Sequence, residues 1–399
     1  MIAYVANWVL PITCPPIREG AVVVENGRIV QVGPAQEVLK GFSGQVCDYG
    51  HGAILPGVVN CHVHLEFSAL AGRVPPQERW DDWLEATLAE FARLSPAEVD
   101  AGISQGIKAL RQSGAALVGE VTNTGASWPH LEQAPLQYHL FYECLGFDLL
   151  EQKDLSELFP FFSQPRVAPA AHVSAAAHAP YSVSAPLFRA IREWNGARGR
   201  PQTVHLGESR AEVEFLARGT GFFEGLLKRR GRWVADFSPP RLSPGAYLER
   251  LGFLGRSTLT VHGVWLEAGD LEALRRSGTW MVLCPRANRY TGAGTPPVTA
   301  FLEAGIPLAL GADSLAGNWD LNLFGEMLWL NRNFPAYPGD LWLRLGTING
   351  AQALGRERDL GSLEAGKTAA LGFIPLKSAA DFWDELYMAG ARGNFCWLG

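Results

Sequence analysis

Histidines and carboxylates stand in this 399-residue sequence at places where they could bind a metal ion. His62 and His64 occur together in the segment NCHVH. Residues two positions apart on a strand project from the same face, so both imidazoles could reach one ion. His205 follows in VHLGE and Asp313 in LGADS. Three histidines and one aspartate form a nitrogen and oxygen ligand set that favours Zn²⁺, with Fe²⁺ and Mn²⁺ as alternatives.

Each of these features has a simpler interpretation when it is considered alone. A single histidine in an apolar strand is more often a hydrogen-bonded core residue than a metal ligand. The sequence contains four such features, however, since His262 also ends an apolar run, in TVHG. Their occurrence in order, at the ends of separate runs, favours a shared metal site.

Eight short apolar runs could provide the strands that position these residues. Helical patterns lie between them, for example over residues 80–94, 96–113, 185–198, 210–217, 268–277 and 299–304. The runs span residues 54–64, 115–123, 136–145, 166–178, 202–208, 258–265, 280–288 and 306–313. This alternation predicts an α/β fold, specifically a (β/α)8 TIM-like barrel over residues 54–359. An open doubly wound sheet is the alternative, but polar residues end too many runs for a single crevice.

The two ends of the chain have a different pattern. Residues 21–25 and 28–32 read as a hairpin around Asn26 and Gly27, and only residues 35–40 suggest a helix. Short strands return after Leu360, in GSLEAGKTAALGFIPL. We therefore expect residues 1–53 and 360–399 to form together a small β-sandwich domain.

The bulk composition excludes several classes of partner. Hydrophobic residues make up 47% of the chain, and the formal net charge is −6, which gives no reason to expect nucleic acid or an anionic membrane. Six scattered cysteines without a CxxC pair, and an N-terminus without a basic region, predict a cytoplasmic protein with reduced thiols. A homodimer is compatible with the sequence, which does not fix the oligomeric state.

The motifs together resemble the amidohydrolase superfamily. The resemblance runs from ILPGVVNCHVHLEFS through HAPYSVS, VHLGES, TVHGVWL, LCPRAN and LALGADSLAGN to LGSLEAGK. It lies in the branch of guanine, S-adenosylhomocysteine and methylthioadenosine deaminases and triazine hydrolases, which implies a small heterocyclic substrate as the partner. By position, the metal ligands would be His62, His64, His205 and Asp313. The resemblance also implies that His262 orients the attacking water and that Glu208 moves protons, although Glu208 could instead be a solvated loop carboxylate.

The resemblance also bears on the number of metal ions. Two-metal relatives typically bridge their ions with a carboxylated lysine on the fourth strand, whereas no lysine occurs here between Lys153 and Lys228. One divalent metal is therefore expected.

Several further residues are candidates for binding the substrate. His178 resembles the residue that contacts a purine ring, with a core histidine as the alternative. Asp82 and Trp83 fall where relatives place a ribose contact, although an exposed helical face would explain them nearly as well. Arg286 and Asn288 end the seventh run, where a guanidinium would suit an anionic group.

The segments VHLGESRAEVEFLARGTGFFEGLL and CPRANRY are similar to the aminodeoxyfutalosine deaminases of the alternative menaquinone pathway. This resemblance implies an adenine nucleoside whose 5′ extension ends in a carboxyphenyl ketone, with Arg286 and Arg289 binding the carboxylate. S-adenosylhomocysteine, methylthioadenosine or guanine deamination and triazine dechlorination are alternatives. A catalytically dead scaffold is the non-enzyme alternative, and the complete set of metal ligands argues against it.

Overall fold

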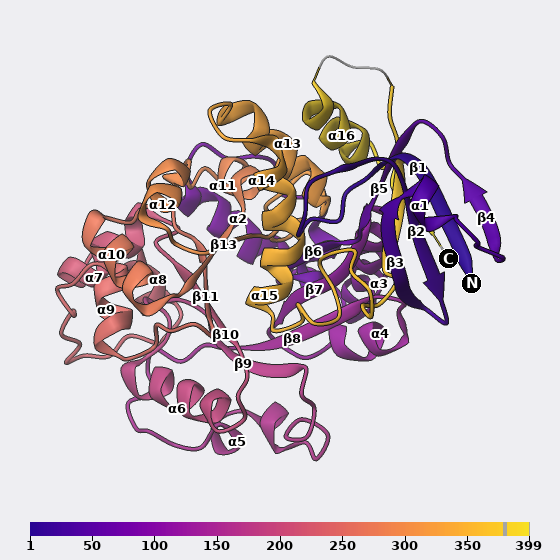
Figure 1. Ribbon diagram of the computed structural model, residues 1–399. Helices are drawn as coiled ribbons and strands as arrows, with labels where there is room; N and C mark the ends of the chain where they lie inside the picture. Colours follow the sequence, from indigo (N-terminus) through magenta and orange to yellow (C-terminus); the bar gives the residue numbers. More distant parts are fainter. Residues whose placement is uncertain (378–380, 399) are drawn as a thin grey trace.

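The ends of the chain meet in one sheet of the computed structural model, which describes residues 1–377 and 381–398. The sheet has seven strands in the order β15-β14-β5-β1-β2-β3, and β4 pairs with β1. The strands are β1 (Ile2–Val9), β2 (Ile17–Glu25), β3 (Arg28–Pro34), β4 (Gln45–Asp48), β5 (Gly52–Pro56), β14 (Leu371–Pro375) and β15 (Cys396–Leu398). Figure 1 shows this sheet at one side of the molecule, beside both termini.

The predicted N-terminal hairpin is confirmed. Strands β2 and β3 pair antiparallel, and the turn residues Asn26 and Gly27 have φ angles of 51° and 72°. The C-terminal segment differs from the expectation of short strands alone, because helix α16 (Phe382–Ala391) lies between β14 and β15. The Asp381 side chain caps this helix by accepting from the backbone N–H groups of Trp383 and Asp384.

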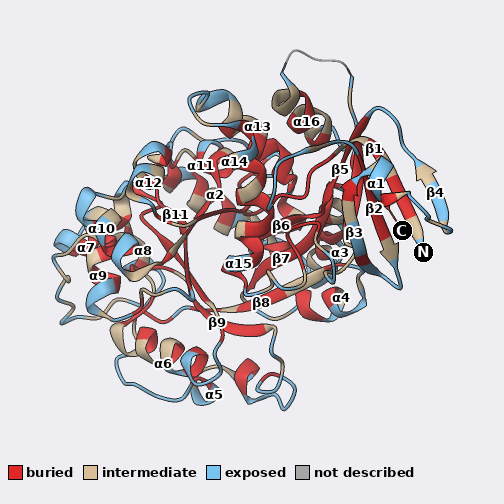
Figure 2. Cartoon of the chain, viewed as in Figure 1, coloured by how far each residue is buried: buried red, intermediate tan, exposed pale blue. Residues whose placement is uncertain are grey.

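Eight further strands form two four-stranded parallel sheets. The first contains β6 (Val58–Val63), β7 (Ala115–Thr122), β8 (Gln137–Cys144) and β9 (Val173–Ala177). The second contains β10 (Gln202–Leu206), β11 (Thr258–His262), β12 (Trp280–Leu283) and β13 (Leu308–Leu310). Most of these residues are buried, as expected for parallel strands that helices cover (Figure 2).

The two sheets contact each other at both of their edges. A parallel bridge joins Val63 to Asp313, and the His205 N–H donates to the His178 carbonyl at 2.9 Å. Gly311 permits the contact between the Val63 and Asp313 segments, because a Cβ atom at position 311 would lie 2.8 Å from the Cβ of His62. Polar residues of both sheets are thereby brought to one side of the strands.

Helices surround the strands in Figure 1. They are α1 (Ala35–Val38), η1 (Leu65–Leu70), α2 (Trp80–Phe91), α3 (Pro96–Gln112), α4 (Ser127–Gln133), α5 (Leu155–Leu158), η2 (Pro160–Ser163), α6 (Ala185–Gly196), α7 (Arg210–Arg218), α8 (Phe222–Arg229), α9 (Pro244–Arg250), α10 (Ala268–Ser277), α11 (Pro285–Thr291), α12 (Val298–Ala304), α13 (Leu323–Asn333), α14 (Gly339–Arg344), η3 (Leu345–Asn349) and α15 (Gly350–Ala353). Local sequence explains several helix starts. Ser95 and Glu98 form a capping box before α3, and Pro96 stands at the first position.

Several predicted strands are wrong in extent, and the run over residues 306–313 is a strand only in β13. The run over residues 54–64 divides at Gly57, so that β5 joins the terminal sheet and β6 begins the parallel strands. The run over residues 166–178 is a strand only in β9. The run over residues 280–288 ends at Leu283, because Pro285 starts helix α11. Apolar runs alone do not separate a buried strand from the buried start of a helix.

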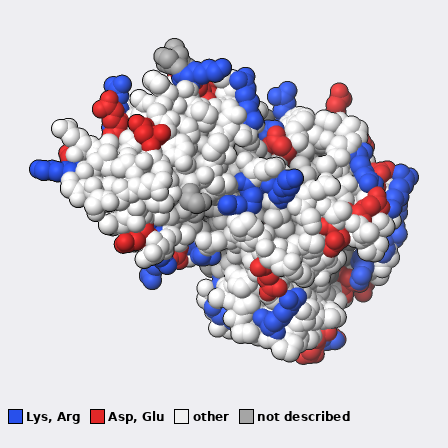
Figure 3. Space-filling model, turned by 90° about the vertical axis from the view of Figure 1, so that its right-hand side faces the viewer, with Lys and Arg blue, Asp and Glu red and all other residues white. Residues whose placement is uncertain are grey.

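The outer surface carries charges of both signs. On the face in Figure 3, lysine and arginine side chains are scattered among acidic and uncharged ones. In the part of the chain that the structure describes, none of the helices combines the length and apolar character that crossing a membrane requires.

Glu66 joins the segments that follow β6 and β7. This buried carboxylate, in η1, accepts hydrogen bonds from the hydroxyls of Thr122 and Thr124 and from three backbone N–H groups, those of Asn123, Thr124 and Ala126. It therefore fixes the chain just after His64, and its removal would leave several buried donors without an acceptor.

Replacing Glu66 with alanine should lower the free energy of unfolding by about 3 kcal/mol, since each unpaired buried donor costs about 1–3 kcal/mol and water can relieve part of the loss. Urea titration would measure this change. The exposed Glu37 supplies a control, because Glu37→Ala should change the stability by less than about 0.5 kcal/mol. A loss below about 1 kcal/mol in Glu66→Ala would contradict the assigned role.

Candidate active site

Three imidazoles converge where the two parallel sheets meet. His62 and His64 project from the end of β6, and His205 projects from β10. The distances between their Nε2 atoms are 3.1 Å (His62 to His64), 3.3 Å (His64 to His205) and 3.3 Å (His62 to His205). Nitrogens bound at about 2.0–2.1 Å to a tetrahedral metal are separated by about 3.3–3.4 Å. The three atoms thus fit the ligand spacing of one ion.

Protonation and tautomers also fit a metal site. Burial lowers the pKa of His62 and His64 well below the usual value, and it lowers the pKa of His205 to about 4. These imidazoles are therefore neutral at pH 7, and each has one ring nitrogen with a free lone pair. The Nδ1–H of His205 donates to the His178 carbonyl at 2.8 Å, which leaves its Nε2 as the free ligand atom.

Asp313 follows β13 and provides a carboxylate beside the histidines. Its Oδ1 lies 3.8 Å from Nε2 of His62 and 3.9 Å from Nε2 of His64. The φ angle of Asp313 is 59°, a backbone conformation that is uncommon outside glycine and found at functional sites. Burial raises the pKa of Asp313 to about 7. A cation beside this carboxylate would stabilise its charged form.

Glu208 and His262 form a second pair in the same cavity. Glu208 Oε1 lies 3.6 Å from His262 Nε2, and both side chains are buried. Burial raises the pKa of Glu208, which favours a protonated carboxyl group that can donate. The Nδ1–H of His262 donates to Asn288 Oδ1 at 2.8 Å, so the Nε2 of His262 remains an acceptor.

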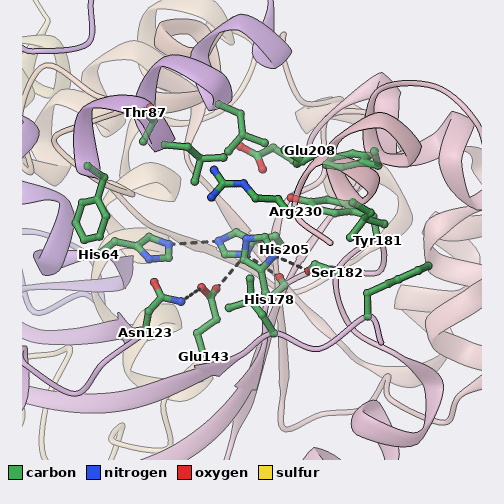
Figure 4. Close-up of a pocket in the computed structure, with 18 of the residues that line it drawn as sticks. His64, Thr87, Asn123, Glu143, His178, Tyr181, Ser182, His205, Glu208 and Arg230 are labelled. Atoms are coloured by element: carbon green, nitrogen blue, oxygen red, sulfur yellow. Dashed lines mark hydrogen bonds and ion pairs between the residues drawn. The ribbon is translucent and has the colours of Figure 1, made fainter. Parts of the chain in front are cut away.

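The structure brings two of the predicted substrate contacts to the cavity. His178 and Trp83 both line it. His178 Nδ1 is hydrogen-bonded to Ser182 Oγ at 2.6 Å, as Figure 4 shows. Trp83 donates its Nε1–H to the Ala316 carbonyl at 2.8 Å, which holds the ring in place.

The other predicted substrate contacts do not line the cavity. Asp82 faces solvent on α2, where its side chain is 63% exposed and pairs with Arg79. Arg286 forms a bidentate pair with Asp320, with both distances 2.8 Å. The exposed Arg289 and the buried Asn288 lie on the same helix, α11. Arg286, Asn288 and Arg289 all belong to helix α11, so they do not lie at the end of a strand. Asn288 instead orients His262.

Several lining residues were absent from the sequence-based candidates. The cavity of about 480 Å³ also contains Glu143, Asn123, Tyr181, Arg230 and Arg232. Glu143 is the next-to-last residue of β8, in FYEC, so the strand-end rule that selected the histidines could have found it. No comparable signal marks Arg230 or Arg232, which follow helix α8. Most of the remaining wall is apolar, with side chains such as Phe67, Leu84, Leu88, Phe91, Phe147 and Leu226.

This combination of a histidine-rich centre and a buried acid at strand ends is typical of metal-dependent hydrolases. The model of the amidohydrolase family matches residues 53–385, and the chain belongs to this family. The prediction of a hydrolytic enzyme is thereby confirmed.

Two curated relatives and one solved structure illustrate the similarity. A 5-methylthioadenosine/S-adenosylhomocysteine deaminase of Syntrophobacter fumaroxidans is 30% identical, over 88% of this chain and 79% of that protein. An aminodeoxyfutalosine deaminase of Deinococcus radiodurans is 26% identical, over 89% of this chain and 85% of that protein. The crystal structure of Helicobacter pylori aminofutalosine deaminase superimposes with a TM-score of 0.87 at 21% identity, covering 99% and 97% of the two chains. That similarity shows the fold.

The convergence of the histidines predicts that His205→Ala loses both its bound metal and its turnover, because an inner ligand is removed. Elemental analysis of folded protein should find about one equivalent of a divalent metal in the wild type and less than about a tenth in the variant. His139 is the matched control, since it is buried on β8 and pairs with Ser174 at 2.7 Å. Metal retained by His205→Ala, or lost from His139→Ala, would contradict the assignment.

Proposed function

We propose that the protein is a hydrolytic deaminase of an adenine-type nucleoside. The reaction replaces the exocyclic amino group with a carbonyl oxygen and releases ammonia. The observation that carries the proposal is the buried Glu208 in the cavity of the three convergent histidines, because a ring-nitrogen proton donor is what an amidine-type carbon requires. The names of the curated relatives support the same reaction.

The metal ligands would be His62, His64, His205 and Asp313. One divalent ion, for which Zn²⁺ is the best match to this ligand set, would supply the Lewis acidity that lets water attack at neutral pH. In the attack, the Asp313 carboxylate accepts a proton from the water. The Nε2 of His262 accepts a hydrogen bond from the same water, held in this role by Asn288.

Glu208 then moves protons to the substrate. Its carboxyl group gives one proton to the ring nitrogen next to the attacked carbon, while the carbon–oxygen bond forms. When the carbon–nitrogen bond breaks, the proton held by Asp313 leaves with the amino group as ammonia, and the proton of the new hydroxyl group returns to Glu208 as the carbonyl forms. The products are the oxo compound and ammonia, and both carboxyl groups regain their starting protonation states. Assistance of this kind contributes about 10²–10⁴-fold to the rate.

The substrate proposed is aminodeoxyfutalosine, which would place the enzyme in menaquinone biosynthesis. The relative from D. radiodurans, which is named for this activity, supports the choice. The cavity volume of about 480 Å³ and its apolar walls also support a nucleoside with a bulky 5′ substituent. Methylthioadenosine and S-adenosylhomocysteine are the alternative substrates.

The architecture proposed for this activity is one closed (β/α)8 barrel. The contacts Val63–Asp313 and His178–His205 at the two sheet edges support closure. Residues 54–359 would form the barrel domain, and residues 1–53 and 360–399 would form the separate β-domain.

Glu208→Gln should lower kcat by about 10²-fold or more while the metal is retained, because the amide keeps the shape of the side chain but cannot transfer the proton. Ammonia release from adenine nucleosides would be measured, with elemental analysis of the same samples. Glu214→Gln, an exposed change on α7, serves as the control and should retain the wild-type rate. A wild-type rate in Glu208→Gln would refute the proton-transfer role. Chloride release from a chlorotriazine, without ammonia from nucleosides, would refute the proposed reaction.

A further inference from the structure

A buried carboxylate lies behind one of the three converging imidazoles. Glu143 is 5% exposed and stands next to last in β8, and its Oε1 lies 3.5 Å from Nδ1 of His205 (Figure 4). The two nitrogens of an imidazole ring project in different directions, and the ligand spacing described above involves Nε2. Glu143 therefore contacts the outer nitrogen of this ring, not the nitrogen proposed to bind the metal.

The outer nitrogens of the three rings differ in their surroundings. Within the described residues, Nδ1 of His62 and Nδ1 of His64 have no hydrogen-bond partner. Nδ1–H of His205 donates to the His178 carbonyl at 2.8 Å, and the same carbonyl accepts the backbone N–H of His205 at 2.9 Å. Glu143 adds a carboxylate oxygen beside this nitrogen. The structure thus concentrates polar contacts behind one of the three rings.

A neighbouring amide fixes the orientation of the Glu143 side chain. Asn123, which follows β7, donates from Nδ2 to Oε2 of Glu143 at 2.7 Å. Oε1 is buried, and no donor among the described residues forms a hydrogen bond with it. A buried carboxylate oxygen without a donor is unfavourable unless positive charge lies next to it. An imidazole that binds a cation is positively polarised, so a metal ion at Nε2 of His205 would favour this placement of Oε1.

We infer that Glu143 is a positioning residue that acts on the metal through His205. Its carboxylate supports the ring orientation that the His178 carbonyl sets, and it makes Nε2 a stronger ligand, because negative charge at the outer nitrogen increases the basicity of the ring. Asn123 contributes by orienting the carboxylate. The inference rests on the metal ligands of the proposed function, and it adds a residue that controls the affinity for the metal without binding it.

The test measures zinc affinity and not turnover. Zinc is transferred at equilibrium from the zinc-loaded, full-length protein to a chromophoric chelator of known affinity, which gives the Kd for Zn²⁺. Glu143→Gln keeps the size of the side chain and removes its charge, whereas Glu143→Asp keeps the charge. Glu385→Gln is the matched control, because Glu385 is a buried carboxylate on α16 that accepts the backbone N–H of Lys377 and does not line the cavity.

Glu143→Gln should raise the Kd by about 10–100-fold, the effect typical of removing a partner behind a metal-bound histidine. Glu143→Asp should bind zinc more tightly than Glu143→Gln, and Glu385→Gln should match the wild type. A role in packing alone predicts the reverse order for the two Glu143 variants, because the shorter aspartate leaves a gap and glutamine does not.

Three results would each overturn the inference. The first is a Kd for Glu143→Gln within about threefold of the wild type, well below the usual effect. The second is weaker zinc binding by Glu143→Asp than by Glu143→Gln. The third is a loss of affinity in Glu385→Gln as large as that in Glu143→Gln.

Failure of the proposed ligand set gives a different result. If the wild type holds no zinc after loading, both the ligand set and the inference are wrong. If the wild type and Glu143→Gln bind zinc equally tightly, only the inference fails. Ammonia release enters neither outcome, so the reaction itself is tested separately by Glu208→Gln.

Discussion

The convergence of three neutral imidazoles is the constraint on which the site depends. Their Nε2 atoms lie 3.1–3.3 Å apart. A neutral imidazole has only one N–H group, so hydrogen bonds among the three rings cannot satisfy all three nitrogens. Contacts outside the cluster hold this arrangement. The His178 carbonyl fixes the ring of His205, and Glu66 fixes the chain just after His64. Gly311 lets β13 approach the strand of His62, so that the fold supplies a ligand set for which a cation is the natural partner.

Buried acidic side chains lie beside these histidines in the same cavity. Asp313 and Glu208 are buried carboxylates, each within 4 Å of a histidine nitrogen, and burial raises the pKa of both. His262, the last residue of β11, and Asp313, shortly after β13, also have positive φ angles, of 76° and 59°. Unfavourable backbone geometry of this kind persists where the surrounding structure fixes it, and it is concentrated at functional sites. One cavity thereby contains the residues proposed as metal ligands, as proton donor and as water-orienting base.

The sequence predicts the centre of the site better than its periphery. His62, His64 and His205 stand at strand ends, and the alternation of a strand determines where such side chains point. Arg286 follows an apolar run as well, but Pro285 begins a helix there and the guanidinium pairs with Asp320. Arg230 approaches the cavity from a loop far along the chain, a placement that tertiary packing determines. The order of the eight strands could be predicted from the residue pattern of the strands, as the positions of the histidines could. The helices α11 and α16 depend instead on local proline and capping signals.

Anomalous X-ray diffraction from crystals of the purified protein, at the absorption edge of its bound metal, tests the central claim most directly. The account predicts one strong peak, about 2.0–2.2 Å from the Nε2 atoms of His62, His64 and His205 and from a carboxylate oxygen of Asp313. Two peaks within about 4 Å of each other would indicate a two-metal centre and contradict the single site. A metal bound elsewhere, with these four side chains unliganded, would contradict the account as a whole.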